Sequence, residues 1–196
     1  MYLLGWTQNA LDMGPYNHKI LVWSKIGMGT FTSTVIFFYS NVPLVLISII
    51  PSSFRSYQML HHLDTPVWME IFVGLTRILL FMLIIAWLSK NKTKELFRKE
   101  FWDRLGKVAS IEMKRNWPHI FLAQLIVFLI FLYGLMNLLI QLIVGLSLVP
   151  LTGLLDIQDY DQESLRYSLV FFLKNMSVIP LSMVYILKMC GVREIR

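Results

Sequence analysis

Four long and predominantly apolar windows follow one another along the chain, separated by polar segments. A membrane-spanning helix needs roughly 20 apolar residues, and a charged side chain at its centre costs about 2.5–3.5 kcal/mol on insertion scales. By this criterion we expect helices at about 27–50, 67–88, 119–146 and 167–189. The pattern predicts an all-α integral membrane protein with four transmembrane helices, built as a single polytopic membrane domain over residues 1–196.

Two of these windows contain features that interrupt or lengthen a simple span. Asn41 and Pro43 fall in the second half of the first window, where we expect a kink because proline removes a backbone donor. The third window, between Arg115 and Asp156, is longer than one span requires. We therefore expect either a tilted helix or a separate interfacial segment within residues 147–155.

The segment between the second and third windows predicts a cytoplasmic amphipathic helix at about 92–115. Its apolar residues recur at spacings of three and four, as on one face of a helix: Phe97, Phe101, Leu105, Val108 and Ile111. We expect the helix to lie on the membrane surface, with Trp102 among the headgroups and anionic lipid or a partner bound by its basic residues. These are Lys94, Arg98, Lys99, Arg104 and Lys107. A helix that packs against its own bundle would show the same stripe.

The charge balance supports a membrane protein and indicates its orientation. The chain is 15% charged and 56% hydrophobic, whereas an ordinary soluble domain carries roughly a quarter charged residues. The net charge of +6 comes mainly from the second loop, and such an excess orients loops rather than binding nucleic acid. We therefore expect a cell-membrane protein whose two termini share the cytoplasmic side with this loop. Its basic residues are Lys90, Lys92, Lys94, Arg98, Lys99, Arg104, Lys107, Lys114 and Arg115.

Three ionisable residues lie inside the predicted spans, where burial of charge is costly and usually functional: Glu70, Arg77 and Lys174. Neutral polar residues fall at similar depths, namely Asn41, Asn137, Gln141 and Asn175. Together they predict an outward-facing polar pocket with surplus positive charge. Such a pocket suits an anionic headgroup, an anionic substrate or a carboxylate from a partner helix. The alternative is structural: the amides make interhelical hydrogen bonds and Glu70 pairs with Lys174 or Arg77.

The sequence predicts no metal or cofactor site. An acidic run (Asp156, Asp159, Asp161 and Glu163) has oxygen ligands but lacks the glycine turn and full ligand set of an EF-hand loop. His61, His62 and Asp64 could join those acids only if two adjacent histidines pointed the same way, which regular structure prevents. The single cysteine, Cys190, excludes an internal disulfide and a cysteine-based zinc site.

No phosphate-binding loop, zinc-protease motif or hydrolase nucleophile motif occurs in the chain. We therefore expect a non-catalytic accessory or regulatory subunit, bound through its spans and basic loop to another membrane protein or to a second copy. One alternative is a transport component in which Arg77 and Lys174 face an anionic solute or lipid. Another is a membrane-embedded enzyme acting on lipid, with Glu70, His61 or His62 as acid-base groups.

Overall fold

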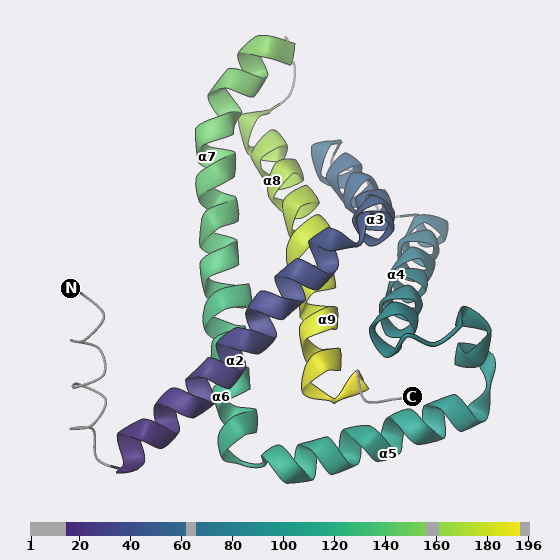
Figure 1. Cartoon of the computed structure of the whole chain (residues 1–196). Coiled ribbons are helices and arrows are strands. Elements are labelled where there is room, and N and C mark those ends of the chain that lie inside the picture. The colour runs from purple at the N-terminus through teal and green to yellow at the C-terminus, as the bar shows by residue number, and fades with distance from the viewer. Residues whose placement is uncertain (1–14, 62–65, 156–160, 193–196) are drawn as a thin grey trace.

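Figure 1 presents a computed structural model of the chain, which describes residues 15–61, 66–155 and 161–192. All elements in these ranges are helices. They are α2 (Pro15–Ser40), α3 (Val42–Leu60), α4 (Val67–Ser89), the 3₁₀ turn η1 (Thr93–Phe97), α5 (Lys99–Asn116), α6 (His119–Val127), the π-helical η2 (Phe128–Leu135), α7 (Met136–Leu155), α8 (Gln162–Leu173), the π-helical η3 (Lys174–Val178) and α9 (Ile179–Met189).

Four stretches of the described chain are long and apolar enough to cross a membrane: Lys19–Ser40, Val67–Ser89, His119–Leu148 and Gln162–Met189. The third joins α6, η2 and α7 into one continuous rod, and the fourth joins α8, η3 and α9 into another (Figure 1). This confirms an all-helical chain with four membrane-length apolar helices. The expected orientation and the surface position of the loop helix remain predictions.

The first expected span, 27–50, is two helices rather than one kinked helix. Pro43 has no amide hydrogen to continue the helical ladder, and α2 ends at Ser40. Asn41 then serves both helix ends, since its side-chain Nδ2 donates to the Phe37 carbonyl at 2.5 Å and its own carbonyl accepts from the Leu44 amide at 2.9 Å. The candidate span consequently begins and ends earlier in the chain, at Lys19 and Ser40.

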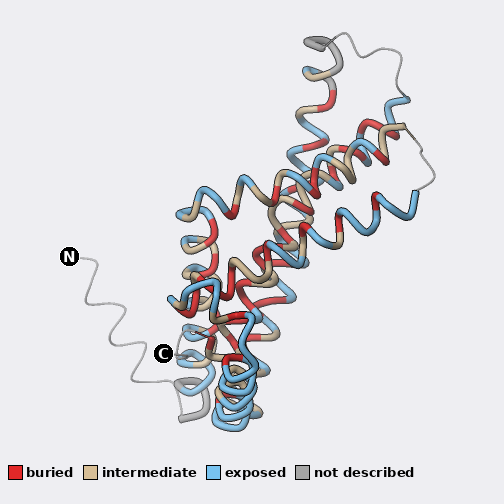
Figure 2. The backbone as a smooth tube through the Cα atoms, turned by 90° about the vertical axis from the view of Figure 1, so that its right-hand side faces the viewer, coloured by how far each residue is buried: buried red, intermediate tan, exposed pale blue. Residues whose placement is uncertain are grey.

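Helix α3 packs along α8, and this is the most extensive helix pairing in the described structure. Three serines at four-residue spacing, Ser48, Ser52 and Ser56, provide the small residues that let helices approach closely. The Ser56 and Ser168 hydroxyls lie 2.6 Å apart, and Ser168 also donates to the Ser56 carbonyl at 2.9 Å. Helices α3 and α4 lie beside each other on one side of the α8–α9 rod (Figure 1), and buried and exposed residues alternate along the helices (Figure 2).

The third and fourth spans are longer than the sequence indicated. Helix α7 continues without a break to Leu155, whereas the candidate span that it completes ends at Leu148. Helix α8 starts at Gln162 instead of 167 because Asp161 caps it, accepting a hydrogen bond from the Ser164 amide at 3.2 Å.

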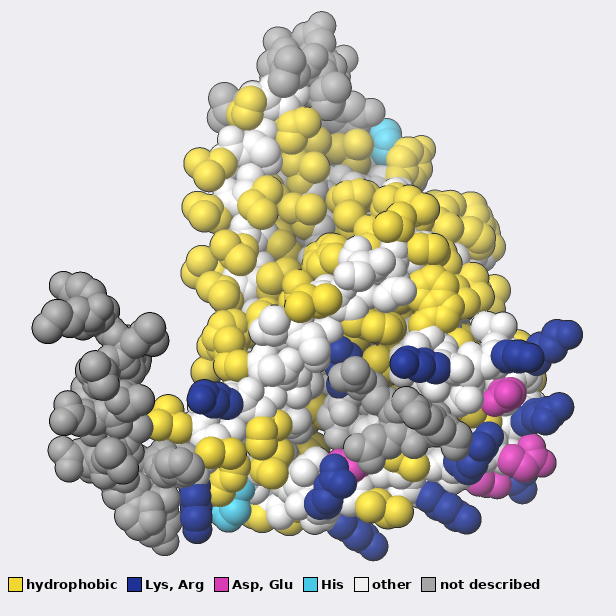
Figure 3. Space-filling view, viewed as in Figure 1, with side chains coloured by type: hydrophobic (Ala, Val, Ile, Leu, Met, Phe, Trp, Pro, Cys, Tyr) yellow, Lys and Arg dark blue, Asp and Glu magenta, His cyan; other side chains and the backbone are white. Residues whose placement is uncertain are grey.

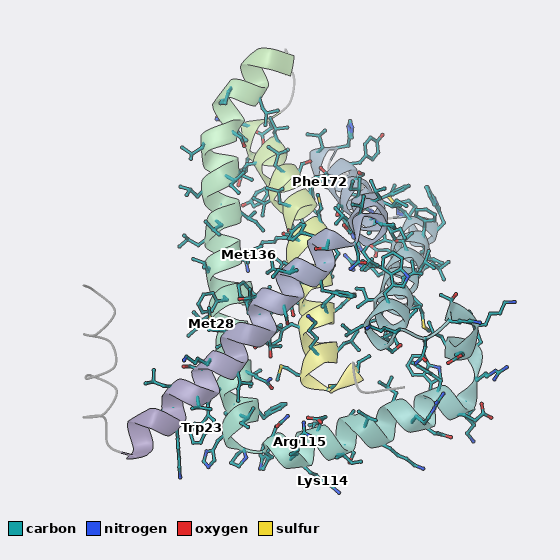
Figure 4. The ribbon with its side chains drawn as sticks, in the orientation of Figure 1. Trp23, Met28, Lys114, Arg115, Met136 and Phe172 are labelled. Atoms are coloured by element: carbon teal, nitrogen blue, oxygen red, sulfur yellow. The ribbon has the colours of Figure 1, made fainter. Side chains whose placement is uncertain are left out.

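Helix α2 crosses the other helices obliquely and packs on α6 and α9. The Trp23 ring stacks on His119 with centroids 4.6 Å apart, at the end of α2 nearest the start of α6 (Figure 4). Deeper in the bundle the buried Tyr185 hydroxyl donates to the Gln124 carbonyl at 2.8 Å. Gly27 lies against Val127 so closely that a Cβ at this position would come within 2.8 Å of the valine Cγ2.

Helix α5 packs on the bundle through only part of its expected apolar stripe. Phe101 is fully buried, and Leu105 and Val108 pack against the core. By contrast, Phe97 is 87% and Ile111 63% exposed, so the ends of the stripe do not face the bundle. Figure 3 shows the charged side chains gathered at the α5 end of the molecule, below a largely hydrophobic surface.

The end of α9 is tied to α5 through a left-handed turn. Gly191 has φ +73°, and a Cβ there would overlap the Glu112 side chain. Glu112 is buried and accepts a hydrogen bond from the Arg115 guanidinium at 2.7 Å. Burial raises the pKa of the neighbouring Cys190 thiol.

Two glycines of α2 provide a matched test of its packing on α6. Gly27→Ala should destabilise the protein by roughly 1–3 kcal/mol, because β-branched Val127 cannot easily move away from the added methyl group. Gly29→Ala is the control, since no atom lies within 4 Å of its Cβ position and alanine favours a helix. Thermal unfolding in detergent should show a lower midpoint for Gly27→Ala only. Equal midpoints would contradict the α2–α6 packing.

Candidate functional site

A cavity of about 520 Å³ lies between α3, α4, the α6–α7 rod and the α8–α9 rod. We call it the cationic cavity because three basic side chains line it. Its lining residues are Arg55, Met59, Arg77, Tyr133, Asn137, Phe171, Lys174, Asn175, Val178 and Ile179. The volume falls within the range of roughly 300–1,000 Å³ that is usual for small-molecule sites.

The α8–α9 rod supplies one wall through residues on a single face. Phe171, Lys174, Asn175 and Val178 follow the three-and-four spacing of a helix face and include most of the π-helical turn η3. Pro180 cannot donate the α-helical hydrogen bond to the carbonyl four residues before it. The Ser48 hydroxyl of α3 donates to that carbonyl, of Met176, at 3.4 Å. An interruption of this kind often occurs at functional sites.

Arg77 is held at the wall by an asparagine of the opposite rod. Its Nη2 donates to Asn175 Oδ1 at 2.5 Å, while Asn175 Nδ2 donates to the Phe171 carbonyl at 2.8 Å and so fixes the direction of the amide. Arg77 Nε is buried without a partner among the described residues, as is Asn137 Oδ1. Both atoms are enclosed by protein and are not exposed to the cavity.

Arg55 is the functional candidate that the sequence analysis missed. Its guanidinium forms a bidentate ion pair with Glu70 and also donates from Nη1 to Gln58 Oε1 at 2.9 Å. The sequence pattern indicated a loop after residue 50, whereas α3 continues to Leu60 and carries Arg55 to the cavity. The signal that was available is the serine spacing from Ser48 to Ser56, which continues a helical face beyond residue 50.

Charge is not balanced within the cationic cavity. Arg55, Arg77 and Lys174 line it, and Glu70 is the carboxylate paired to one of them. Lys174 has no hydrogen-bond or ion-pair partner in the described part of the chain. Arg77 and Lys174 therefore provide two positive charges with no carboxylate of their own, a combination that favours an anionic ligand.

The structure brings together four of the seven residues that the sequence singled out: Arg77, Lys174, Asn137 and Asn175. Glu70 contacts the cavity only through Arg55. Gln141, one turn beyond Asn137, does not line the cavity and accepts a hydrogen bond from Arg166 at an exposed position, 3.2 Å away. Asn41 does not line it either, because its amide caps α2.

A second candidate site runs along the outer face of α5. Trp102, Asp103, Gly106, Lys107, Ser110 and Ile111 line a shallow groove of about 620 Å³. The five basic residues expected to dock lipid or a partner, Lys94, Arg98, Lys99, Arg104 and Lys107, are all exposed. Trp102 donates a hydrogen bond from its Nε1 to the Leu96 carbonyl at 2.7 Å.

Of the residues considered for a metal site, three lie within the described ranges: His61, Asp161 and Glu163. His61 packs on Tyr57 with ring centroids 4.4 Å apart. Residues 62–64 and 156–160, which include His62, Asp64, Asp156 and Asp159, lie outside the described residues. Within residues 15–61, 66–155 and 161–192, no group of three or more histidine, cysteine, aspartate or glutamate side chains could hold a metal ion.

Comparison of the chain with models of protein families, with curated proteins and with solved structures finds no match. Function is therefore argued from the site itself.

A double-mutant cycle should measure the interhelical hydrogen bond at the cavity wall. Combining Arg77→Leu with Asn175→Leu should give a coupling energy of about 0.5–2 kcal/mol, because each single change already removes the shared contact. The free energy of unfolding in mixed detergent micelles provides the readout. Arg77→Leu with Gln141→Leu is the control pair and should be additive within about 0.5 kcal/mol. Additivity of both pairs would mean that Arg77 and Asn175 do not interact.

Proposed function

We propose that this multi-pass membrane protein binds an anionic solute or lipid in the cationic cavity and acts as a transport component. The observation that carries the proposal is the presence of Arg55, Arg77 and Lys174 around one cavity with a single carboxylate among them. Ionisable side chains inside spans are costly, and they commonly mark the path of a substrate or ion.

The depth of the cavity supports transport rather than recognition at the membrane surface. Arg77 is the eleventh of the 23 residues of α4, and Lys174 is the thirteenth of the 28 residues from Gln162 to Met189. Asn137 is the nineteenth of the 30 residues from His119 to Leu148. All three lie near the middle of a candidate span, and substrate sites of membrane transporters lie near the bilayer midplane.

The proposal includes an orientation, with both termini and α5 on the cytoplasmic side of the cell membrane. It is supported by the gathering of Lys and Arg along α5 and η1 (Figure 3), because cytoplasmic loops are enriched in these residues. Four spans lack the inverted-repeat symmetry of a complete secondary transporter. The chain would therefore work with a second copy or with another membrane protein.

The enzyme alternative receives less support from the geometry. The Glu70 carboxylate is engaged by Arg55, and a paired carboxylate is a poor general acid or base. Of the two histidines that could act as acid-base groups, His61 lies within the described residues. It packs against Tyr57 and does not line the cavity.

Removal of Arg77 tests the proposal directly. Arg77→Leu should weaken binding of inorganic phosphate or sulfate at least tenfold, because a hydrogen bond to a charged group contributes about 1.5–3 kcal/mol. Isothermal titration of the protein in an uncharged detergent gives the dissociation constant. Arg166→Leu removes an exposed arginine outside the cavity and should leave binding unchanged. Equal affinity of parent and Arg77→Leu would remove the cavity from consideration as an anion site.

The accessory or regulatory subunit remains a second candidate, because α5 presents an unusual outer face. Ile111 of α5 is exposed, as are Phe97 and Trp117, which flank the helix, the last at 62%; basic residues lie between them in the sequence. Aromatic residues and arginine are enriched at protein interfaces. A cytoplasmic segment of a membrane-protein partner, or anionic lipid at the cytoplasmic face, would bind this surface.

Charge removal on this face tests the second candidate. Replacing Lys94, Arg98 and Lys99 together by glutamine should abolish stoichiometric co-purification of a partner from nanodiscs, as identified by mass spectrometry. Replacing Lys19, Lys25 and Arg166 by glutamine removes the same number of charges away from α5 and should retain the partner. Co-purification that survives the triple change would leave these charges with a role in orientation only.

A further inference from the structure

A second, largely apolar cavity of about 260 Å³, which we call the apolar groove, lies next to the cationic cavity. Tyr133, Val178 and Ile179 line both, so the two spaces share a wall. The remaining lining of the groove consists of Phe81, Ser182, Met183 and Ile186. A charged space and a largely apolar space are thus adjacent.

The change from polar to apolar occurs in the same direction on three walls. On α4, Arg77 lines the cationic cavity and Phe81, one turn further along, lines the groove. On the α8–α9 rod, Lys174 precedes the groove residues by about one to three turns. The α6–α7 rod runs the opposite way, and there Asn137 lies at the charged part and Tyr133, one turn earlier, at the groove (Figure 1).

We propose that the site takes an amphiphile, a phosphate monoester carried on a hydrocarbon chain, with its head in the cationic cavity and its chain in the apolar groove. This inference rests on the proposed anion-binding function and narrows its ligand. The cavity has two cations in excess of its carboxylate, and a phosphate monoester carries about −1.5 to −2 charges at pH 7. A carboxylate head would leave one of those cations uncompensated.

The cationic residues match the same head. Arg77 and Lys174 line the cavity without a carboxylate partner in the described ranges, and charge-assisted hydrogen bonds from such groups to phosphate oxygens are strong. In the groove, Phe81, Met183 and Ile186 would contact the hydrocarbon chain of the ligand. The flexible thioether of Met183 adapts readily to such a chain.

The test compares three probes in an uncharged detergent: dodecyl phosphate, inorganic phosphate and dodecanol. Native mass spectrometry and titration should show one bound dodecyl phosphate per chain, held at least tenfold more tightly than inorganic phosphate, and no specific binding of dodecanol. Dodecanol binding as tight as that of dodecyl phosphate would overturn the inference, because the head would then not be recognised.

Filling the groove should affect only the chain-bearing probe. Ile186 lines the groove and is 50% exposed, so Ile186→Trp adds bulk there without disturbing the core. It should weaken dodecyl phosphate at least tenfold and leave inorganic phosphate within twofold. Leu142→Trp is the matched control, since Leu142 is 54% exposed on α7 and does not line the groove. Unchanged affinity of Ile186→Trp for dodecyl phosphate would overturn the groove assignment.

Photo-crosslinking gives a readout that does not depend on a variant folding. Dodecyl phosphate with a diazirine at the chain end should label residues 178–186 or the region around Phe81. Label confined to the outer surface of α7 would overturn the inference. The two proposals fail differently: if Arg77→Leu binds both phosphates as the parent does, the anion site itself is wrong. If phosphate binding depends on Arg77 but Ile186→Trp does not weaken dodecyl phosphate, the anion site stands and only the amphiphilic ligand is wrong.

Discussion

A guanidinium near the middle of an apolar bundle needs acceptors, and the arrangement around Arg77 depends on that need. An arginine can neither be neutralised by deprotonation nor reach far toward water from this depth. The structure meets the requirement only partly. Arg77 Nη2 donates to the side-chain Oδ1 of Asn175 at 2.5 Å, and Arg77 Nε has no partner among the described residues. The remaining demand for negative charge is what distinguishes this cavity from a packed helix interface.

Helix α3 makes that arrangement possible, although it is not one of the four membrane-length apolar helices. Its serines allow it to lie close to α8, and Ser48 supplies a donor to the Met176 carbonyl that Pro180 leaves without its helical partner. The same helix carries Arg55 to the cavity and, through Arg55, engages Glu70. Helix α3 thus satisfies the Met176 carbonyl, packs closely on α8 and contributes the positive charge of Arg55 to the cavity.

The two candidate surfaces differ in how they present charge. In the cationic cavity the basic groups are partly buried among apolar walls, where low dielectric strengthens each interaction with an anion. Along α5 the basic groups are exposed, and salt largely screens their attraction to a partner or to lipid that is more than about 10 Å away. The cavity therefore suits a specific, tightly held ligand, whereas α5 suits an adaptable surface contact.

Hydropathy alone determined that the chain is helical, that four of its helices are long and apolar enough to cross a membrane, and that Arg77 and Lys174 lie within them. These properties follow from the local transfer energies of side chains, which do not depend on neighbouring helices. The sequence indicated an interruption at Asn41 and Pro43 but not two separate helices. The extension of α3 and the continuation of α7 to Leu155 were not evident either, because capping contacts and helix packing decide where helices end.

Only the tertiary structure decided which polar residues meet. Asn137 and Gln141 are one turn apart and have similar chemistry, yet one lines the cavity and the other bonds to Arg166 outside it. Arg55 belongs to the site through the α3–α8 pairing, which joins residues more than 100 positions apart in the chain. The sequence determined the depth of each residue along its helix. The rotation and pairing of the helices depend on packing between distant segments, and no local pattern records them.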